Sequence, residues 1–314
     1  YGRNCLIQFE DFANQNAFRL LNKYRNLYCT FNDDIQGTAS VAVAGLLAAL
    51  QITQNKLSDH TILFQGAGEA AMGIANLLIM GMEKEGTPKT EAIKKIWMVD
   101  SKGLIVKGRV SVTPEKEVFA HQHEEMKNLE DVVNKIKPSV LIGVAAIAGA
   151  FTKNIIKNMA SFNKRPIIFA LSNPTSKAEC SAEDCYNLTE GRGIFASGSP
   201  FNPVTLHDGR MFYPGQGNNA YVFPGIALGV VSCGVICQQV SKKHLDEGRL
   251  YPPLVAIRDI AELAYKNKTA TFYPEPEDKE AFIRSQMYHT DYESFLTDSY
   301  IWPEKAMKIQ TRKV

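Results

Sequence analysis

Two groups of residues in this sequence have the types and the spacing that chemistry requires. The first is the glycine turn Gly66-Ala67-Gly68, which separates an apolar, β-prone run from a segment whose apolar residues recur at helical spacing. Gly66 allows a tight turn, and Gly68 lets a pyrophosphate approach the bare backbone. The N–H groups at the start of the helix would then bind the phosphates. The pattern predicts a dinucleotide site, and simple packing of helix on strand is the alternative.

The second group consists of carboxylates that follow two short apolar runs. Glu10 and Asp11 follow the first run, and Asp33 and Asp34 follow the second. A helix cap at Asp11 and a surface charge at Glu10 explain the first pair without a metal, and this is the favoured account of that pair. Two adjacent aspartates exceed what a cap needs, so their repulsion favours a cation between them. Oxygen ligands from Glu10, Asp11 and Asp34 suit Mg²⁺ or Mn²⁺ and not zinc.

A further cofactor contact is expected at Asp100, which ends the strand-like run at residues 94–100. This is where a dinucleotide fold commonly binds the adenosine ribose. Asp100 lies 32 residues after Gly68, which exceeds the usual spacing and which a polar insertion explains. The neighbouring groups that can offset the charge of Asp100 and accept a 2′-phosphate are Ser101, Lys102 and Lys116.

Alternating strand-like and helical stretches predict an α/β fold with a doubly wound parallel sheet of Rossmann type. A polar turn places Asn173 at the carboxyl ends of these strands, where ligands bind, although a turn residue before Pro174 explains it equally well. The further strands are expected at residues 140–145, 166–172 and 193–197, with helices near 154–160 and 182–189.

Paired amides, Asn218 and Asn219, precede an apolar helical stretch. Such a pair can cap the helix and bind a carboxylate, and capping needs only one of them. His121 and His123 lie in a charged segment without other ligands, which favours a solvated loop over a metal site.

Composition argues against several classes of partner. A net charge of +2 without an arginine-rich run predicts no nucleic-acid partner. Six cysteines without a C-x-x-C pair indicate thiols in a reducing compartment, and a cytoplasmic location is expected. Two uncharged stretches, residues 35–52 and 221–237, approach the length of a membrane span, but their polar residues and Pro224 favour buried helices and no membrane contact.

Five motifs in order resemble the malic enzyme family over essentially the whole chain. They are FEDF at 9–12, FNDDIQGTA at 31–39, GAGEAA at 66–71, ALSNPT at 170–175 and PGQGNN at 214–219. The stretch VDSKGLIVKGR at 99–109 and the ending KAMKIQ are closer to the cytosolic NADP-linked type than to the mitochondrial NAD-linked type.

The resemblance implies an enzyme that oxidises malate at its C2 hydroxyl, reduces NADP and releases CO₂ and pyruvate with a divalent metal, Mg²⁺ or Mn²⁺. NAD is the alternative cofactor. The implied metal ligands are Glu10, Asp11 and Asp34; Asp33 would support the catalytic base, and Asn173 and Asn219 would contact malate. The implied cofactor contacts are Gly66, Gly68, Glu69, Ala70, Asp100, Ser101, Lys102, Lys116 and Asn173. Full-length members are tetramers, so a homo-oligomer is expected.

The sequence also departs from the family. The tyrosine acid and lysine base of the family come from a region that would precede Tyr1, and helical sequence is missing around residues 234–236 and 260–261. We therefore expect a fragment, a splice variant or a partial gene product, with a non-catalytic dinucleotide-binding module as the alternative to an enzyme. Since no methionine begins the chain, a targeting segment can be missing, and a mitochondrial location is the alternative.

The expected organisation has four parts. Residues 1–32 would end the substrate and metal domain, and residues 33–218 would form the dinucleotide-binding domain. Residues 219–272 would return as shortened helices to a partial helical substrate domain, and residues 273–314 would form a C-terminal extension.

Overall fold

The structure is a computed structural model that describes residues 6–110, 112–223, 240–251, 266, 274–278 and 281. The chain divides into two units, Tyr1–Glu275 and Pro276–Val314, and every element below belongs to the first. The segments expected to be shortened, around residues 234–236 and 260–261, lie outside the described residues, as does most of the expected C-terminal extension.

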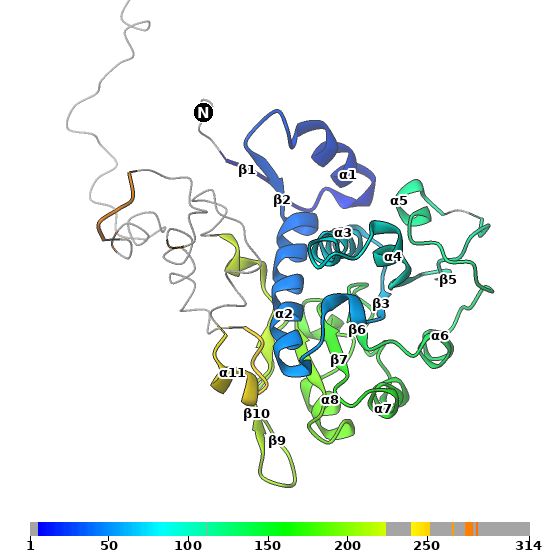
Figure 1. Cartoon of the computed structure of the whole chain (residues 1–314), viewed down its shortest axis with the longest axis vertical. Coiled ribbons are helices and arrows are strands. Elements are labelled where there is room, and N and C mark those ends of the chain that lie inside the picture. Colours follow the sequence, from blue (N-terminus) through cyan, green and yellow to red (C-terminus); the bar gives the residue numbers. More distant parts are fainter. Residues whose placement is uncertain are drawn as a thin grey trace, which may run out of the picture. The chain divides into compact units, whose positions relative to one another are not determined.

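A seven-stranded sheet with the strand order β11-β8-β7-β6-β3-β4-β5 forms the centre of the first unit. Figure 1 labels β3, β5, β6 and β7 of this sheet. All neighbouring strands run parallel except β4 and β5, which pair antiparallel at one edge. The predicted doubly wound parallel sheet is thus confirmed. The strands are β3 (Ile62–Gln65), β4 (Ile96–Asp100), β5 (Gly103–Leu104), β6 (Val140–Gly143), β7 (Ile167–Ala170), β8 (Ile194–Ser197) and β11 (Gly215–Gln216).

Helices cover both faces of this sheet. Successive residues of a strand point to opposite faces, so their side chains pack into two separate hydrophobic cores. Ile62 and Phe64 join the core under α2 (Thr38–Thr53) and α3 (Glu69–Lys84). Leu63 joins the core on the other face. Burial on both sides explains why the strands are continuous apolar runs. The helices of that other face are α6 (Leu129–Ile136), α7 (Lys153–Phe162) and α8 (Ala182–Leu188).

The first uncharged stretch forms a buried helix, as predicted. A π-helical turn, η1 (Asp33–Gly37), leads into α2, which packs along α3. The combined helix Asp33–Thr53 is long and apolar enough to cross a membrane, yet 72% of its apolar window is buried inside the protein. Burial of this extent is what a core helix of a globular protein shows. Residues 224–237 of the second stretch lie outside the described residues.

A separate two-stranded sheet comes before the main one. Strands β1 (Ile7–Phe9) and β2 (Thr30–Asn32) pair in parallel, and α1 (Ala13–Tyr24) connects them. The predicted cap at Asp11 is wrong. Asp11 has φ of 56°, and α1 begins after Phe12 without a side-chain cap. The left-handed turn directs the Asp11 backbone away from the helix and toward Asp34.

The expectation of a solvated loop at the histidines is corrected at His121. Its ring stacks on Trp97 with centroids 3.6 Å apart, and its Nε2 lies 2.7 Å from the Ile96 carbonyl oxygen.

The remaining short elements connect these layers. The short elements are η2 (Leu57–Asp59), α4 (Lys89–Lys94), α5 (Pro114–Glu117), η3 (Thr175–Lys177), β9 (Val204–Thr205), β10 (Met211–Phe212), η4 (Asn219–Tyr221) and α11 (Lys242–Asp246).

Candidate functional site

The glycine turn joins β3 to α3 at the carboxyl edge of the sheet. Gly66 has φ of +120°, and a Cβ at this position would lie 2.9 Å from the Val144 carbonyl oxygen. Only glycine combines this backbone conformation with so close a neighbour. The predicted sequence of strand, turn and helix is confirmed, with α3 beginning at Glu69.

A side-chain oxygen already lies at the start of α3. The Glu69 N–H donates to Asn14 Oδ1 over 2.8 Å, and a Cβ on Gly68 would lie 3.2 Å from the same oxygen. The first turn of α3 therefore presents a backbone donor to an oxygen acceptor, as a phosphate site would. Asn14 is 55 residues away from Glu69, so no local pattern could have indicated it.

The predicted carboxylates gather at one end of the small sheet. Parallel pairing places Phe9 opposite Asn32, so the acids that follow both strands leave from the same edge. The Asp11 N–H donates to Asp34 Oδ2 over 2.8 Å. Burial raises the pKa of Glu69 on α3, and the charges of Asp34 and Asp11 raise it further. The carboxylate cluster therefore adjoins the helix that follows the glycine turn.

Asp33 is the buried member of this group, with 3% of its surface exposed. Its Oδ2 accepts from Asn219 Nδ2 at 2.8 Å, while its Oδ1 has no hydrogen-bond partner. Burial, with smaller effects from Glu10 and Asp34, raises the pKa of Asp33 to about 6, against the lowering effect of the Asn219 bond. A Cβ at Gly37 would lie 1.9 Å from Oδ1, so only glycine leaves room for this carboxylate.

The carboxylates lack a compensating cation among the residues that the structure describes. No Lys or Arg there forms an ion pair with Glu10, Asp11, Asp33, Asp34 or Glu69. Within the same residues, no three His, Cys, Asp or Glu side chains are arranged to hold a metal as they stand. The orphaned Asp33 oxygen and the oxygen-only donor set nevertheless fit a hard divalent cation.

The two adjacent amides have different roles. Asn218 caps η4 by accepting from the Ala220 N–H at 2.9 Å. Asn219 Nδ2 donates to Asp33 Oδ2 and, over 3.0 Å, to Thr38 Oγ1. Both of its amide hydrogens are therefore used within the protein. Asn173 lies exposed at the carboxyl end of β7, before a cis peptide bond to Pro174.

Asp100 is held by cations of its own loop. Its Oδ2 accepts from Arg109 Nη2 at 2.6 Å and from Lys116 Nζ at 3.1 Å, and its Oδ1 accepts from the Lys102 N–H at 2.9 Å. These bonds lower the pKa of Asp100 against the opposing effect of burial. Ser101 and the Lys102 side chain are exposed beside it.

Arg109 was missed by the sequence analysis. Only 5% of its side chain is exposed, and its Nη1 also donates to the carbonyls of Gly103 and Leu104. In the sequence, Arg109 is recognisable only as a basic residue nine positions after Asp100. This spacing matches neither the period of a helix nor that of a strand, so it does not indicate a contact. Arg109 neutralises the carboxylate that the sequence alone assigns to a ribose.

A parallel sheet with a glycine turn before a helix, and with polar groups at the carboxyl ends of its strands, defines a dinucleotide-binding protein of Rossmann type. The family model described as "Malic enzyme, NAD binding domain" matches residues 35–267. The chain belongs to the malic enzyme family.

Relatives agree with this assignment, and a solved structure shares the fold. The chain is 71% identical over 334 residues to an NADP-dependent malic enzyme of Homo sapiens, covering 99% of this chain and 58% of that protein. It is 66% identical to a mitochondrial NADP-dependent malic enzyme of the same species, of which it covers 55%. The malic enzyme of Entamoeba histolytica shares the fold with a TM-score of 0.66 at 23% identity, over 90% of this chain and 60% of that one.

The chain spans about 58% of the length of the human relative. The alignment covers 334 residues although the chain has 314, so that relative contains residues without a counterpart here.

We predict that Arg109→Gln lowers the free energy of unfolding by about 3 kcal/mol, because it leaves the Asp100 carboxylate, whose side chain is only 10% exposed, short of a charge partner. Urea unfolding followed by circular dichroism measures the loss. Lys94→Gln is the matched control, since it removes a cation from an ion pair whose side chains are 66% and 53% exposed, and should change stability by less than about 0.5 kcal/mol. Equal effects of the two substitutions would contradict the buried pairing.

Proposed function

We propose that this chain supplies the cofactor-binding part and a share of the metal site of an enzyme that oxidises and decarboxylates malate with NADP. The observation that carries the proposal is the carboxylate cluster beside the glycine-turn helix, where Glu69 of α3 is close enough to Asp34 and Asp11 for their charges to raise its pKa. A dinucleotide at the turn and a cation at the cluster would then be neighbours. The relatives named NADP-dependent malic enzyme support the proposal.

Glu10, Asp11 and Asp34 would hold Mg²⁺ or Mn²⁺, the cations that such a donor set suits. Such a metal supplies a charge that stabilises negative charge developing on a substrate oxygen. Asn219 positions Asp33 through the bond to its Oδ2. Because both amide hydrogens of Asn219 are used, a malate carboxylate could reach them only by replacing Asp33 or Thr38. Asn173 is exposed and its side chain forms no hydrogen bond with the described residues, so it could contact malate directly.

We predict that Asp34→Ala weakens Mn²⁺ binding to the 314-residue chain at least about tenfold, because it removes a ligand and the acceptor of the Asp11 N–H. Calorimetric titration measures the affinity. Asp131→Ala, which removes an exposed carboxylate from α6, is the control with the same change in net charge. Equal Mn²⁺ affinities for wild type and Asp34→Ala would remove Asp34 from the metal site.

The charge balance around Asp100 favours NADP over NAD. Arg109 and Lys116 together carry one more charge than the carboxylate they hold, and Asp100 is no longer a free acceptor for the ribose hydroxyls. The positive excess, with Ser101 and Lys102 exposed beside it, suits a 2′-phosphate.

Lys116→Gln should therefore weaken NADP binding about tenfold and leave NAD binding within about twofold, since only NADP carries the 2′-phosphate that the ammonium group would contact. Fluorescence titration of both dinucleotides gives the two affinities. Lys107→Gln removes an exposed lysine of the same loop that does not contact Asp100, and should leave both unchanged. An unchanged NADP-to-NAD ratio in Lys116→Gln would exclude Lys116 from cofactor selection.

The alternative is a module that binds the dinucleotide without catalysing the reaction. The sequence contains no counterpart of the tyrosine acid and lysine base expected from the family, and loss of each such group costs factors of about 10² to 10⁴ in rate. We predict that the purified 314-residue chain binds NADP but forms no measurable NADPH from malate and Mn²⁺. Turnover close to that of a full-length malic enzyme would show that residues of this chain provide the acid and the base.

We further propose that the protein acts as a homo-oligomer in the cytoplasm. Two relatives are named mitochondrial, so a mitochondrial location is the alternative.

A further inference from the structure

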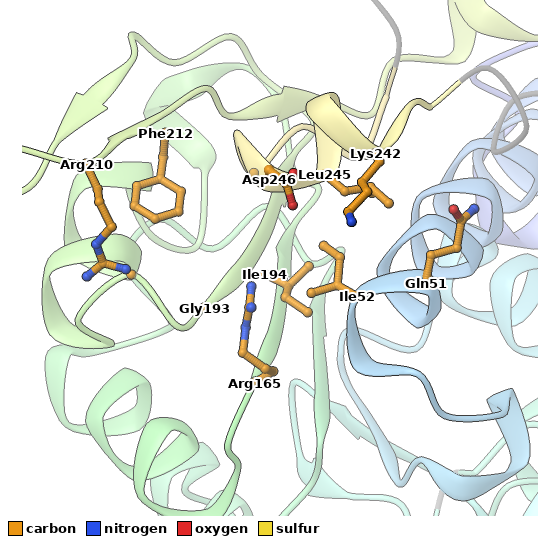
Figure 2. Close-up of a pocket in the computed structure, with 12 residues that line it drawn as sticks. Gln51, Ile52, Arg165, Gly193, Ile194, Arg210, Phe212, Lys242, Leu245 and Asp246 are labelled. Atoms are coloured by element: carbon orange, nitrogen blue, oxygen red, sulfur yellow. The ribbon is translucent and has the colours of Figure 1, made fainter.

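A cavity of about 400 Å³ lies at the amino ends of the strands of the main sheet (Figure 2). It is bounded by Ile194 at the start of β8, Ile52 at the end of α2 and Leu245 of α11. The glycine turn and Asp100 lie beyond the carboxyl ends of the strands, whereas Ile194 begins one. A strand of four residues, at about 3.3 Å per residue, separates its amino end from its carboxyl end by roughly 13 Å. The cavity is therefore separate from the candidate cofactor site.

Cationic side chains line this cavity. Arg165, Arg210 and Lys242 contribute to its wall, and Asp246 is the acidic residue among its lining side chains. Figure 2 shows the Arg165 guanidinium and the Lys242 amino group pointing toward the same space from opposite sides.

Arg165 is the least compensated of these cations. Its Nε donates to the Arg192 carbonyl oxygen at 2.8 Å, but it forms no ion pair within the described part of the chain, and its two terminal nitrogens have no hydrogen-bond partner there. Partial burial lowers the pKa of Arg165, and the charges of Arg192 and Arg210 lower it further. A half-buried guanidinium beside two others is costly unless an anion joins it.

The neighbouring groups do not cancel this charge. Arg192 is fixed by the carbonyls of Ala160 and Asn163, each at 3.0 Å, and these bring no negative charge. Arg210 pairs with Asp208 at 2.7 Å on the exposed side. With Lys242 and Asp246 included, the lining residues and their neighbours contain four cations, Arg165, Arg192, Arg210 and Lys242, and two carboxylates, Asp208 and Asp246.

We propose that this cavity binds a small organic polyanion, specifically a di- or tricarboxylate. Planar guanidinium groups bind carboxylate oxygens in pairs, and the side chains of Ile52, Ile194 and Leu245 would contact the carbon chain of the ligand. A nucleotide fits less well, because the one aromatic ring that lines the cavity, that of Phe212, is buried and stacked on Tyr186 at 4.6 Å. Among the described residues, no ring is left there for a base to stack on.

The test is calorimetric titration of citrate into the full 314-residue chain at low ionic strength, with saturating NADP present. We expect one citrate per chain, with Arg165→Gln and Lys242→Gln each weakening binding about tenfold through the loss of a charge-assisted contact. Lys243→Gln is the matched control: it makes the same charge change on the same helix, but its side chain is 84% exposed and does not line the cavity. It should change the affinity less than twofold.

Lys242 is exposed, so its substitution tests the proposal even if Arg165→Gln unfolds the protein. Absence of citrate binding would overturn the proposal. Equal weakening of citrate binding by Lys242→Gln and Lys243→Gln would also overturn it, because it would indicate general attraction of the anion to a basic surface. Titration of inorganic pyrophosphate distinguishes the ligand class. Pyrophosphate binding without citrate binding would overturn the carboxylate assignment.

Discussion

The parallel hydrogen bonding of β3 between β4 and β6 is the constraint on which the rest of the structure depends. Ile62 pairs with both Ile96 and Val140, and Gln65 lies opposite Val99 and Gly143, so the three strands end together. The glycine turn and Asp100 therefore leave the sheet at the same edge. A shift in register would separate them and turn each buried side chain to the other face.

Charge compensation differs between the polar groups that this framework supports. The Asp100 carboxylate is fully engaged by Arg109, Lys116 and a backbone N–H. By contrast, the acids around Asp33 have no cationic partner among the described residues, and the arginines around Arg165 have only Asp208. Uncompensated charge in a partly buried site is costly, so the two unbalanced clusters are where we place ligands of opposite sign. For the third group, in which Arg109 and Lys116 exceed the single Asp100 carboxylate by one charge, we propose a role in selecting between the cofactors.

The exposure of apolar side chains in the first unit differs between the small sheet and the main sheet. Ile7, Phe12, Leu27 and Tyr28 belong to the small sheet and its connections, and each exposes more than a third of its surface. The main sheet shows no comparable exposure in its central strands, whose side chains are buried on both faces. The main sheet and its helices therefore have a hydrophobic core of their own, whereas the small sheet buries little apolar surface.

The sequence by itself determined the strands, the helices and the local turns. Apolar residues recur every two residues in strands and every 3.6 residues in helices, and these patterns, like the glycine turn, depend only on residues close together in the sequence. It predicted the order of strands and helices, the buried α2 and the adjacent carboxylates. Only the tertiary structure decided which side chains meet. Asn219 is 186 residues from Asp33, Asn14 is 55 from Glu69, and the basic cavity combines α2, β8 and α11. Such partners leave no periodic signal, since folding alone brings them within hydrogen-bonding distance.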